Sequence, residues 1–533
     1  MAPTVDHSLD VILMRLGDLG KFQCTVLSLI CAAIILHSAV HVSFVFTALD
    51  IQHRCEVPGC DSADSQYYTP WLKDAVPFSD GKPEKCDMYA SYSDNSNCSV
   101  FNTDKTLRCS SFIYKTEEKS ILQEYDLHCD NNLWKLTFVG TMNNIGQFFG
   151  LFISGIMSDR YGRKQVLIWG MVACAICGII RAFMPTYELF LVFEFLDAAF
   201  AAGTYICGFV LGVELVGPKN RVLTGVVSSS CYAVGEVFAA GSAWLLQSWK
   251  PIIFTLYSPI FLLLTYIWLV PESVRWLLSK GRIDEAKEIL RKVAKTNGKE
   301  ISENSLDKLS MMAQEESQRV EHPFKEALKS TPLMLRLINC CFCWITCTFL
   351  FYGLTLNSVA LAGNSYLDFI LTSLVEIPAY VSCNFMVDKW GRRKTLCWSY
   401  ILTGAGCAAF IFIPEDLEWG SLVVYLLGKF GATAAFTILY VLTSEMFPTN
   451  MRHSFMGTCS TFGRIGSMVS PQTPLLSQIW TPLPLVCFAS MSVIAGILTM
   501  LFPETLNTKL PDTIEEAINI GKNKNTDKEN AIH

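Results

Sequence analysis

The sequence predicts an all-α membrane protein in which twelve transmembrane helices form two six-helix bundles. Its composition is the first reason. With 51% hydrophobic and 17% charged residues and a mean hydropathy of +0.34, the 533 residues are too apolar for a set of soluble domains. The second reason is an internal repeat. Residues 159–164 read Asp-Arg-Tyr-Gly-Arg-Lys, and residues 388–394, 229 positions later, read Asp-Lys-Trp-Gly-Arg-Arg-Lys. A parallel repeat of membrane spans is typical of proteins whose two halves rock about a central site.

Twelve stretches are long and apolar enough to be spans, since a helix needs about 20 residues to cross the hydrocarbon core. They are roughly 22–46, 136–157, 165–184, 189–213, 222–247, 251–271, 333–357, 366–387, 395–413, 420–444, 454–476 and 482–502. The expected division is an N-terminal segment (1–21), a first bundle (22–271) with a loop domain at 47–135, a helical linker (272–332), a second bundle (333–502) and a tail (503–533). Strands are not expected within the membrane, because lipid leaves open sheet edges unsatisfied.

The distribution of basic residues predicts the orientation. Lys and Arg lie in alternate short loops, which share one side of the membrane. The short loops 185–188, 358–365 and 414–419, on the other side, contain neither residue. The positive-inside rule therefore places both termini and the 272–332 linker in the cytoplasm and the 47–135 loop outside.

Six cysteines lie in that outer loop, where an oxidising compartment favours disulfides. They are Cys55, Cys60, Cys86, Cys98, Cys109 and Cys129. Three disulfides are expected, and all fifteen connectivities remain open. Asn97 begins an Asn-Cys-Ser acceptor for N-glycosylation in the same loop.

The repeated loop motifs are expected to control the cytoplasmic ends of the helices. Asp159 can pair with an Arg four residues on or on another helix, Gly162 permits a tight turn, and Gly155 lets a neighbouring helix approach. The candidate gating residues are Gly155, Asp159, Arg160, Gly162, Arg163, Glu214 and Arg221 in the first half, and Asp388, Gly391, Arg392, Arg393, Glu445 and Arg452 in the second.

Several classes of function are excluded. The net charge of −6 and pI near 5.8 provide no basic surface for nucleic acid. Absence of a Walker A motif excludes direct ATP-driven pumping, and no nucleophile and base at a defined spacing suggests an enzyme. No cofactor or metal is expected, because the clustered cysteines at 340, 341, 343 and 347 lie on one helix and cannot surround an ion.

The loop motifs resemble those of the major facilitator superfamily. Pro271-Glu-Ser-Val-Arg-Trp-Leu-Leu-Ser-Lys-Gly-Arg282, the cysteine-bearing first outer loop and the segment Lys429–Pro448 resemble, more narrowly, the organic cation, carnitine and organic anion transporter family. Two positions depart from the pattern. Asn384 stands where the first copy has Gly155, and Val274 where the family commonly has a second proline.

Ionisable residues inside spans are costly and are candidates for function. They are Glu194, Asp197, Glu236, Glu376, Lys429 and Arg464. For Glu194 and Asp197 an ion pair that fixes helix packing is an equal alternative. The resemblance implies an acid in the central cavity at Glu376, with a helix loosened just beyond it by Pro378. By the same resemblance, Arg464 implies a carnitine-type or anion-type substrate. Tyr380 matches the residue that carnitine-type relatives have at its position.

Aromatic residues provide the remaining candidates. Trp344, Phe351, Tyr352 and Tyr205 match positions at which the family binds cations, and their rings can attract a quaternary ammonium. His37 and His41 lie one helical turn apart; hydrogen-bonded packing is the favoured interpretation of this pair over contact with substrate or proton.

The sequence therefore predicts a plasma-membrane carrier for small organic cations and zwitterions such as carnitine, working by alternating access and driven electrogenically by the membrane potential. Glu376 and Glu236 would meet the cationic end and Arg464 with Lys429 a carboxylate. A coupling ion, Na⁺ or H⁺, is left open. The alternatives are an organic anion exchanger and a non-transporting receptor on a carrier fold.

Overall fold

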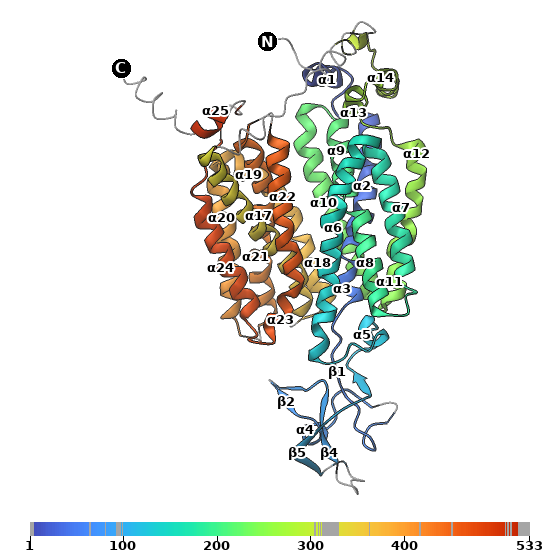
Figure 1. The fold of residues 1–533 in the computed structure, drawn as a ribbon, viewed down its shortest axis with the longest axis vertical. Coiled ribbons are helices and arrows are strands. Elements are labelled where there is room, and N and C mark those ends of the chain that lie inside the picture. Colours follow the sequence, from blue (N-terminus) through green and yellow to red (C-terminus); the bar gives the residue numbers. More distant parts are fainter. Residues whose placement is uncertain are drawn as a thin grey trace, which may run out of the picture.

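A computed structural model describes residues 5–520 apart from 63–64, 80, 92–97, 99, 303–304, 308, 310, 312–329, 362, 415–416, 449–450, 507, 509–510 and 512–513. Two groups of helices stand side by side, and a small domain containing strands projects from one end (Figure 1). We call that end the loop-domain end. The opposite end, where α1 (Val5–Arg15), α14 (Ile283–Asn297) and α25 (Ile514–Asn519) lie, is called the α1 end.

The first half is built from helices that cover the first six predicted spans. They are α2 (Lys21–His41) with α3 (Ser43–Thr47), α6 (Leu133–Tyr161), α7 (Arg163–Arg181), α8 (Tyr187–Ala201) with α9 (Thr204–Leu215), α10 (Arg221–Leu246), and α11 (Trp249–Tyr257) continued by the 3₁₀ segment Ser258–Thr265 and α12 (Tyr266–Leu269). After α12 come α13 (Val274–Ser279) and the amphipathic α14, which buries Ala286, Leu290 and Val293.

The second half repeats this arrangement. Its helices are α17 (Thr331–Asn357), α18 (Ser365–Leu374) with α19 (Glu376–Trp390), α20 (Arg392–Ile411), α21 (Glu418–Met446), α22 (Arg452–Val469) continued by Ser470–Gln472 and α23 (Thr473–Ser477), and α24 (Leu483–Thr499).

By length and composition, eight helical segments of the described residues are able to cross a membrane. The other four predicted spans are helical as well. Of these, α24 is too short, and α6, α20 and α22 have too polar a composition. Their polar side chains face other helices: Asn143, Asn144 and Gln147 of α6 are all buried. The all-α membrane fold is confirmed, and these spans owe their stability to helix packing as well as to apolar composition.

The loop domain contains the strands of the described chain, in three two-stranded antiparallel pairs. The pairs are β1 (His53–Cys55) with β6 (Phe112–Tyr114), β2 (Phe78–Ser79) with β3 (Lys82–Pro83), and β4 (Asp87–Ser91) with β5 (Phe101–Arg108). The six cysteines form three disulfides, Cys55–Cys109, Cys60–Cys98 and Cys86–Cys129. Asn97 lies outside the described residues.

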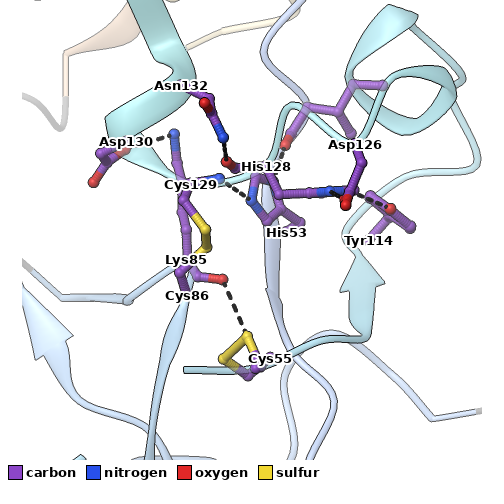
Figure 2. Close-up of a disulfide and its surroundings, with 12 residues drawn as sticks. His53, Cys55, Lys85, Cys86, Tyr114, Asp126, His128, Cys129, Asp130 and Asn132 are labelled. Atoms are coloured by element: carbon purple, nitrogen blue, oxygen red, sulfur yellow. Dashed lines mark hydrogen bonds and ion pairs between the residues drawn. A yellow bond between two sulfur atoms is a disulfide. The ribbon is translucent and has the colours of Figure 1, made fainter. Parts of the chain in front are cut away.

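One disulfide attaches the loop domain to a spanning helix. Cys129 immediately precedes the 3₁₀ turn Asp130–Asn132 that leads into α6. Figure 2 shows His128 beside this turn, with its Nδ1 2.7 Å from Asp126 Oδ1 and its Nε2 2.7 Å from the Tyr114 hydroxyl. The polar contacts and the disulfide together fix where α6 begins.

The two halves meet mainly through α6 with α22 and α10 with α18 and α19. Hydrogen bonds across this interface lie toward the loop-domain end. Thr137 donates to Gln472 Oε1 (3.2 Å), Gln472 Nε2 donates to Thr141 Oγ1 (2.7 Å), and the Tyr366 hydroxyl donates to Glu118 (3.1 Å). The protein is therefore closed between its halves at the loop-domain end.

Candidate functional site

A buried ion pair occupies the middle of the second half. Lys429 Nζ on α21 lies 2.8 Å from Glu376 Oε1, and neither side chain is exposed. The ammonium also donates to Thr355 Oγ1 (2.6 Å) and to the Phe351 carbonyl (3.2 Å), and it lies 3.6 Å from the centre of the Phe351 ring. An ammonium has three donors, and two of those of Lys429 form hydrogen bonds, while its charge is paired with Glu376.

A break in the eighth span positions Glu376. Helix α18 ends at Leu374 and α19 begins at Glu376. Pro378 has no N–H to donate to the Leu374 carbonyl four residues earlier, so the helix is interrupted there. The expected weak point thus exists, but it lies before Glu376 rather than beyond it. A helical N–H donates to the carbonyl four residues earlier, so the hydrogen bond lost at Pro378 is on its N-terminal side. Glu376 Oε2 accepts a hydrogen bond from the Tyr380 hydroxyl at 3.1 Å.

Glu236 is the second buried acid at the centre. It lies on α10 of the first half, 1% exposed, where α10 packs against α18 and α19 of the second half. Its Oε2 has no hydrogen-bond partner among the described residues.

An unbroken series of ring contacts crosses from one half to the other. In the first half Tyr205 contacts Tyr232 with ring centres 5.3 Å apart, and His41 contacts Tyr232 at 6.1 Å. His41 then contacts Tyr352 of the second half at 5.9 Å. The predicted Tyr205 and Tyr352 therefore belong to one aromatic cluster.

Within the second half the series continues along α17 and α21. Phe351 contacts Tyr352 at 5.3 Å and stacks on Phe436 at 5.1 Å. Tyr440 contacts Phe436 at 5.3 Å and Trp344 at 4.4 Å. Trp344 is 1% exposed, whereas Tyr440 is 37% exposed, so the cluster is less tightly enclosed by protein at its Tyr440 end.

Arg464 of the second half contacts the first half of the protein. On α22, it donates from Nη1 to Gln147 Oε1 of α6 at 3.0 Å and is partly buried. Gln147 also lines a small cavity in the first half together with His37, His41, Asn143 and Asp197.

The other charged residues in the spans form a structural network. Arg181 pairs with Glu194 and lies 3.2 Å from Asp197, and all three are buried. Asp197 accepts from the Tyr257 hydroxyl at 2.5 Å. The packing alternative for Glu194 and Asp197 fits this geometry, because both carboxylates lie beside one buried arginine and Asp197 is also hydrogen-bonded to Tyr257. His37 and His41 are likewise hydrogen-bonded, to Thr204 at 2.8 Å and Tyr232 at 2.7 Å.

The repeated loop motifs form equivalent structures in the two halves. Asp159 pairs with Arg163 at 3.3 Å and Asp388 with Arg392 at 3.6 Å. The intervening glycines have positive φ, +104° at Gly162 and +89° at Gly391, a conformation that L side chains rarely adopt.

Glu272 and Glu504 complete these motifs, although neither was among the predicted gating residues. Glu272 Oε1 accepts from the Arg163 N–H at 3.1 Å, and Glu504 Oε1 accepts from the Arg392 N–H at 2.8 Å. Each carboxylate satisfies the first free N–H groups of the next helix. Burial raises the pKa of Glu272, and the backbone N–H groups of Ser273, Lys164 and Arg163 oppose that shift. A possible signal in the sequence was the repetition of Pro-Glu-Ser at 271–273 as Pro-Glu-Thr at 503–505.

The remaining gating residues make contacts within their own half. Arg221 pairs with Asp10, Ser273 Oγ donates to Glu214, and Arg392 Nε lies 3.1 Å from Glu445 Oε2. Arg393 donates to the Phe502 carbonyl at 3.4 Å, Arg160 lies over the Tyr161 ring, and Arg452 begins α22.

The close helix approach expected at Gly155 is wrong for this structure. A Cβ built there would meet no atom within 4 Å. The close approaches on α6 occur five and nine residues earlier, where the carbonyls of Ala199 and Phe195 lie against Gly150 and Gly146. The reason is that α6 packs against α8 at these two glycines and not at Gly155.

Comparison with known proteins identifies the family. Residues 89–516 match the family described as "Sugar (and other) transporter". The chain therefore belongs to this family of the major facilitator superfamily. It is a multi-pass membrane transporter and not an enzyme.

The transporter has full-length relatives among characterised proteins. It is 31% identical to "Solute carrier family 22 member 1" of Bos taurus over 99% of this chain and 95% of the relative. It is 30% identical to "Solute carrier family 22 member 2" of Homo sapiens, over 98% and 97% of the two chains. It is also 30% identical to the "Organic cation transporter protein" of Drosophila melanogaster, over 96% and 95%.

Solved structures support the fold of the transporter. The partially occluded inward open conformation of the xylose transporter XylE from E. coli matches 92% of this chain and 100% of that one with a TM-score of 0.62 at 15% identity. XylE bound to 6-bromo-6-deoxy-D-glucose matches 93% and 99% with a TM-score of 0.58, also at 15% identity.

Proposed function

We propose that this transporter carries small organic cations and zwitterions, including carnitine-like quaternary ammonium compounds, across the plasma membrane. The observation that supports this most directly is the aromatic series from Tyr205 to Trp344, which passes from one half to the other beside Glu236, Glu376 and Lys429. Aromatic faces attract quaternary ammonium groups, and carboxylates balance their charge. The names of the relatives, which include an organic cation transporter, agree with this substrate class.

The cationic end of the substrate is proposed to compete with Lys429. Since Glu376 is already paired, a substrate ammonium must displace the lysine or bind first at the unpaired Glu236. The Phe351 ring, now against Lys429, would then be free to face the substrate. Binding by exchange of ion-pair partners avoids leaving a buried charge without a partner.

Arg464 is proposed to bind the carboxylate of a zwitterion. Arg464 is partly buried and its partners among the described residues, Gln147 and Tyr352, are neutral, so its charge is not paired with an acid and a guanidinium can bind a carboxylate bidentately. A carrier of this kind would accept both simple cations and carnitine-like zwitterions.

The anion-exchange alternative is less well supported. It would require Lys429 and Arg464 to act together on an anion, but Lys429 is engaged by Glu376 and the second acid, Glu236, lies beside them.

The transport cycle is proposed to be alternating access. Contacts at the loop-domain end join the halves, whereas the gating contacts at the α1 end described above lie within each half. In this proposal the termini and the 272–332 linker lie in the cytoplasm, and the 47–135 domain lies outside and is glycosylated at Asn97. In that orientation the structure is closed to the outside. Uncoupled uptake driven by the membrane potential is the simplest form of such a carrier.

The experiment compares uptake of labelled carnitine and labelled tetraethylammonium by cells that express wild type, Glu376→Gln or Arg464→Ala. Glu376→Gln is expected to lower both uptakes, and Arg464→Ala to lower carnitine uptake alone. Surface biotinylation supplies the expression control. Unchanged uptake of both substrates in both variants, at equal surface expression, contradicts the proposed site.

A further inference from the structure

The central site holds one carboxylate more than its lysine can neutralise. Lys429 donates to Thr355 and to the Phe351 carbonyl and forms its ion pair with Glu376. Its single positive charge can balance only one of the two carboxylates. No ion pair joins Glu236 to any cation in the described part of the chain, and Arg464 donates instead to Gln147.

Among the described residues that face Glu236, Lys429 carries the one positive charge. On its own helix it has Tyr232, α18 contributes Ser373, and α19 contributes Glu376 and Tyr380. From α17 comes Tyr352, and from α21 comes Lys429. His37 and His41 of α2 lie behind Tyr232, and the Nδ1 of each is engaged by a hydroxyl. Both Glu236 Oε2 and Ser373 Oγ lack hydrogen-bond partners there.

An ionised carboxylate that is 1% exposed, has no ion pair among the described residues and leaves its Oε2 without a hydrogen bond is strongly destabilising in a low-dielectric interior. Protonation removes that charge and supplies a donor. A metal ion is a poorer occupant, because hard cations take several oxygen ligands. The described residues contain no group of three or more His, Cys, Asp or Glu side chains placed to hold a metal.

We propose that Glu236 carries an exchangeable proton when the site is empty and loses it when an organic cation binds. In the binding step the O–H bond of the Glu236 carboxyl breaks and the proton passes to water on the side to which the site is open. The resulting carboxylate then pairs with the substrate cation without a covalent bond. The empty carrier returns only after Glu236 is protonated again from the opposite side.

The position of Glu236 suits this role. Helix α10 borders α18 and α19 of the other half, so rocking of the halves changes which side Glu236 faces. This inference rests on the proposed function and deepens it. Each monovalent cation would exchange for one proton, and its movement would transfer no net charge, in place of uncoupled electrogenic uptake.

The test uses purified full-length protein in liposomes and labelled tetraethylammonium. With the membrane potential held at zero, a gradient of one pH unit, acidic inside, is expected to accumulate the cation about tenfold in wild type. Glu236→Gln is expected to lose this response and to follow an inside-negative potential instead. The matched control is Glu188→Gln, an exposed acid at the start of α8, which should behave as wild type.

The inference is overturned if wild type accumulates the cation in response to the membrane potential and not to the pH gradient. It is also overturned if a sodium gradient drives accumulation in place of the proton gradient. Retention of the pH response by Glu236→Gln overturns it too. A second measurement needs no variant: addition of tetraethylammonium to wild-type protein in weakly buffered detergent should release about one proton per cation bound, and binding without release contradicts the proposal. Counterflow of tetraethylammonium with no pH response counts against this inference alone, whereas absence of counterflow counts against the proposed function as well.

Discussion

Lys429 Nζ lies 2.8 Å from Glu376 Oε1 in a position from which solvent is excluded. The lysine comes from α21, and the acid sits where the eighth span is interrupted between α18 and α19. We proposed above that a cationic substrate binds where this pair lies. It can therefore hold the empty site together and give way to the substrate.

We expect Glu376→Gln and Lys429→Met to destabilise the protein singly, because removing one partner of a buried pair costs about 3–5 kcal/mol. The double variant should recover most of that stability without recovering transport. Thermal unfolding of purified protein in detergent measures the effect. Losses that add up in the double variant would show that the two side chains do not stabilise each other.

Tyr440 is expected to contribute to cation binding through its ring rather than its hydroxyl, since it lies 4.4 Å from Trp344 at the exposed end of the aromatic cluster. Tyr440→Leu should weaken tetraethylammonium binding by about 0.5–2 kcal/mol, and Tyr440→Phe should leave it nearly unchanged. Competition binding to purified protein compares the two. Equal losses in both variants would assign the effect to the hydroxyl.

Closure at the loop-domain end predicts a specific cross-link. Thr137 on α6 and Gln472 beside α22 are hydrogen-bonded at 3.2 Å across the halves. Cysteines at both positions should form a disulfide under mild oxidation and stop transport, and a reductant should restore it. Each single cysteine variant is the control. Transport that continues at full rate in the cross-linked protein would rule out opening of this interface during the cycle.

The loop domain should lose stability in acid through Asp61. Burial tends to raise the pKa of Asp61, but hydrogen bonds from Arg54 and the Val57 N–H outweigh it and hold that pKa below its usual value. A carboxyl with a lowered folded-state pKa contributes stability above its unfolded pKa of about 4, and this stability is lost as the pH falls through the folded value.

Limited proteolysis of the whole protein between about pH 3 and pH 5 tests this expectation. Cleavage within the loop domain should rise toward low pH in wild type. Asp61→Asn should be cleaved readily at every pH, because it leaves Arg54 buried without its carboxylate. The exposed Asp104→Asn is the control. Equal resistance of Asp61→Asn and wild type at neutral pH would contradict the role given to this pair.

The sequence predicted the helical spans well because their apolar lengths are set by the membrane itself. It offered a pair four residues apart as one of two alternatives for Asp159, because residues four apart on a helix are neighbours, and Asp159–Arg163 has that spacing. It could not show that Glu272 and Glu504 cap the following helices, since each acts on residues about 110 positions away. The pairing of the six cysteines depends in the same way on the folded loop domain.

Only part of the candidate site was predicted, because residues distant in the sequence complete it. Trp344, Phe351, Tyr352 and Tyr205 do lie in one aromatic cluster, but Tyr232, Phe436 and Tyr440 complete it. The spacing of Phe436 and Tyr440 after Lys429, by seven and eleven residues, places them on one face of α21 and could have indicated them. Pairing of Lys429 with Glu376 was not predicted, because charge alone does not reveal which buried groups meet.

Counterflow of labelled tetraethylammonium in liposomes that contain the purified protein tests the central claim most directly, because it requires no driving ion or potential. Vesicles preloaded with unlabelled tetraethylammonium should take up the label transiently, well above vesicles without preload and vesicles without protein. Saturable binding of tetraethylammonium to the same protein with no counterflow would contradict a carrier and indicate a receptor instead.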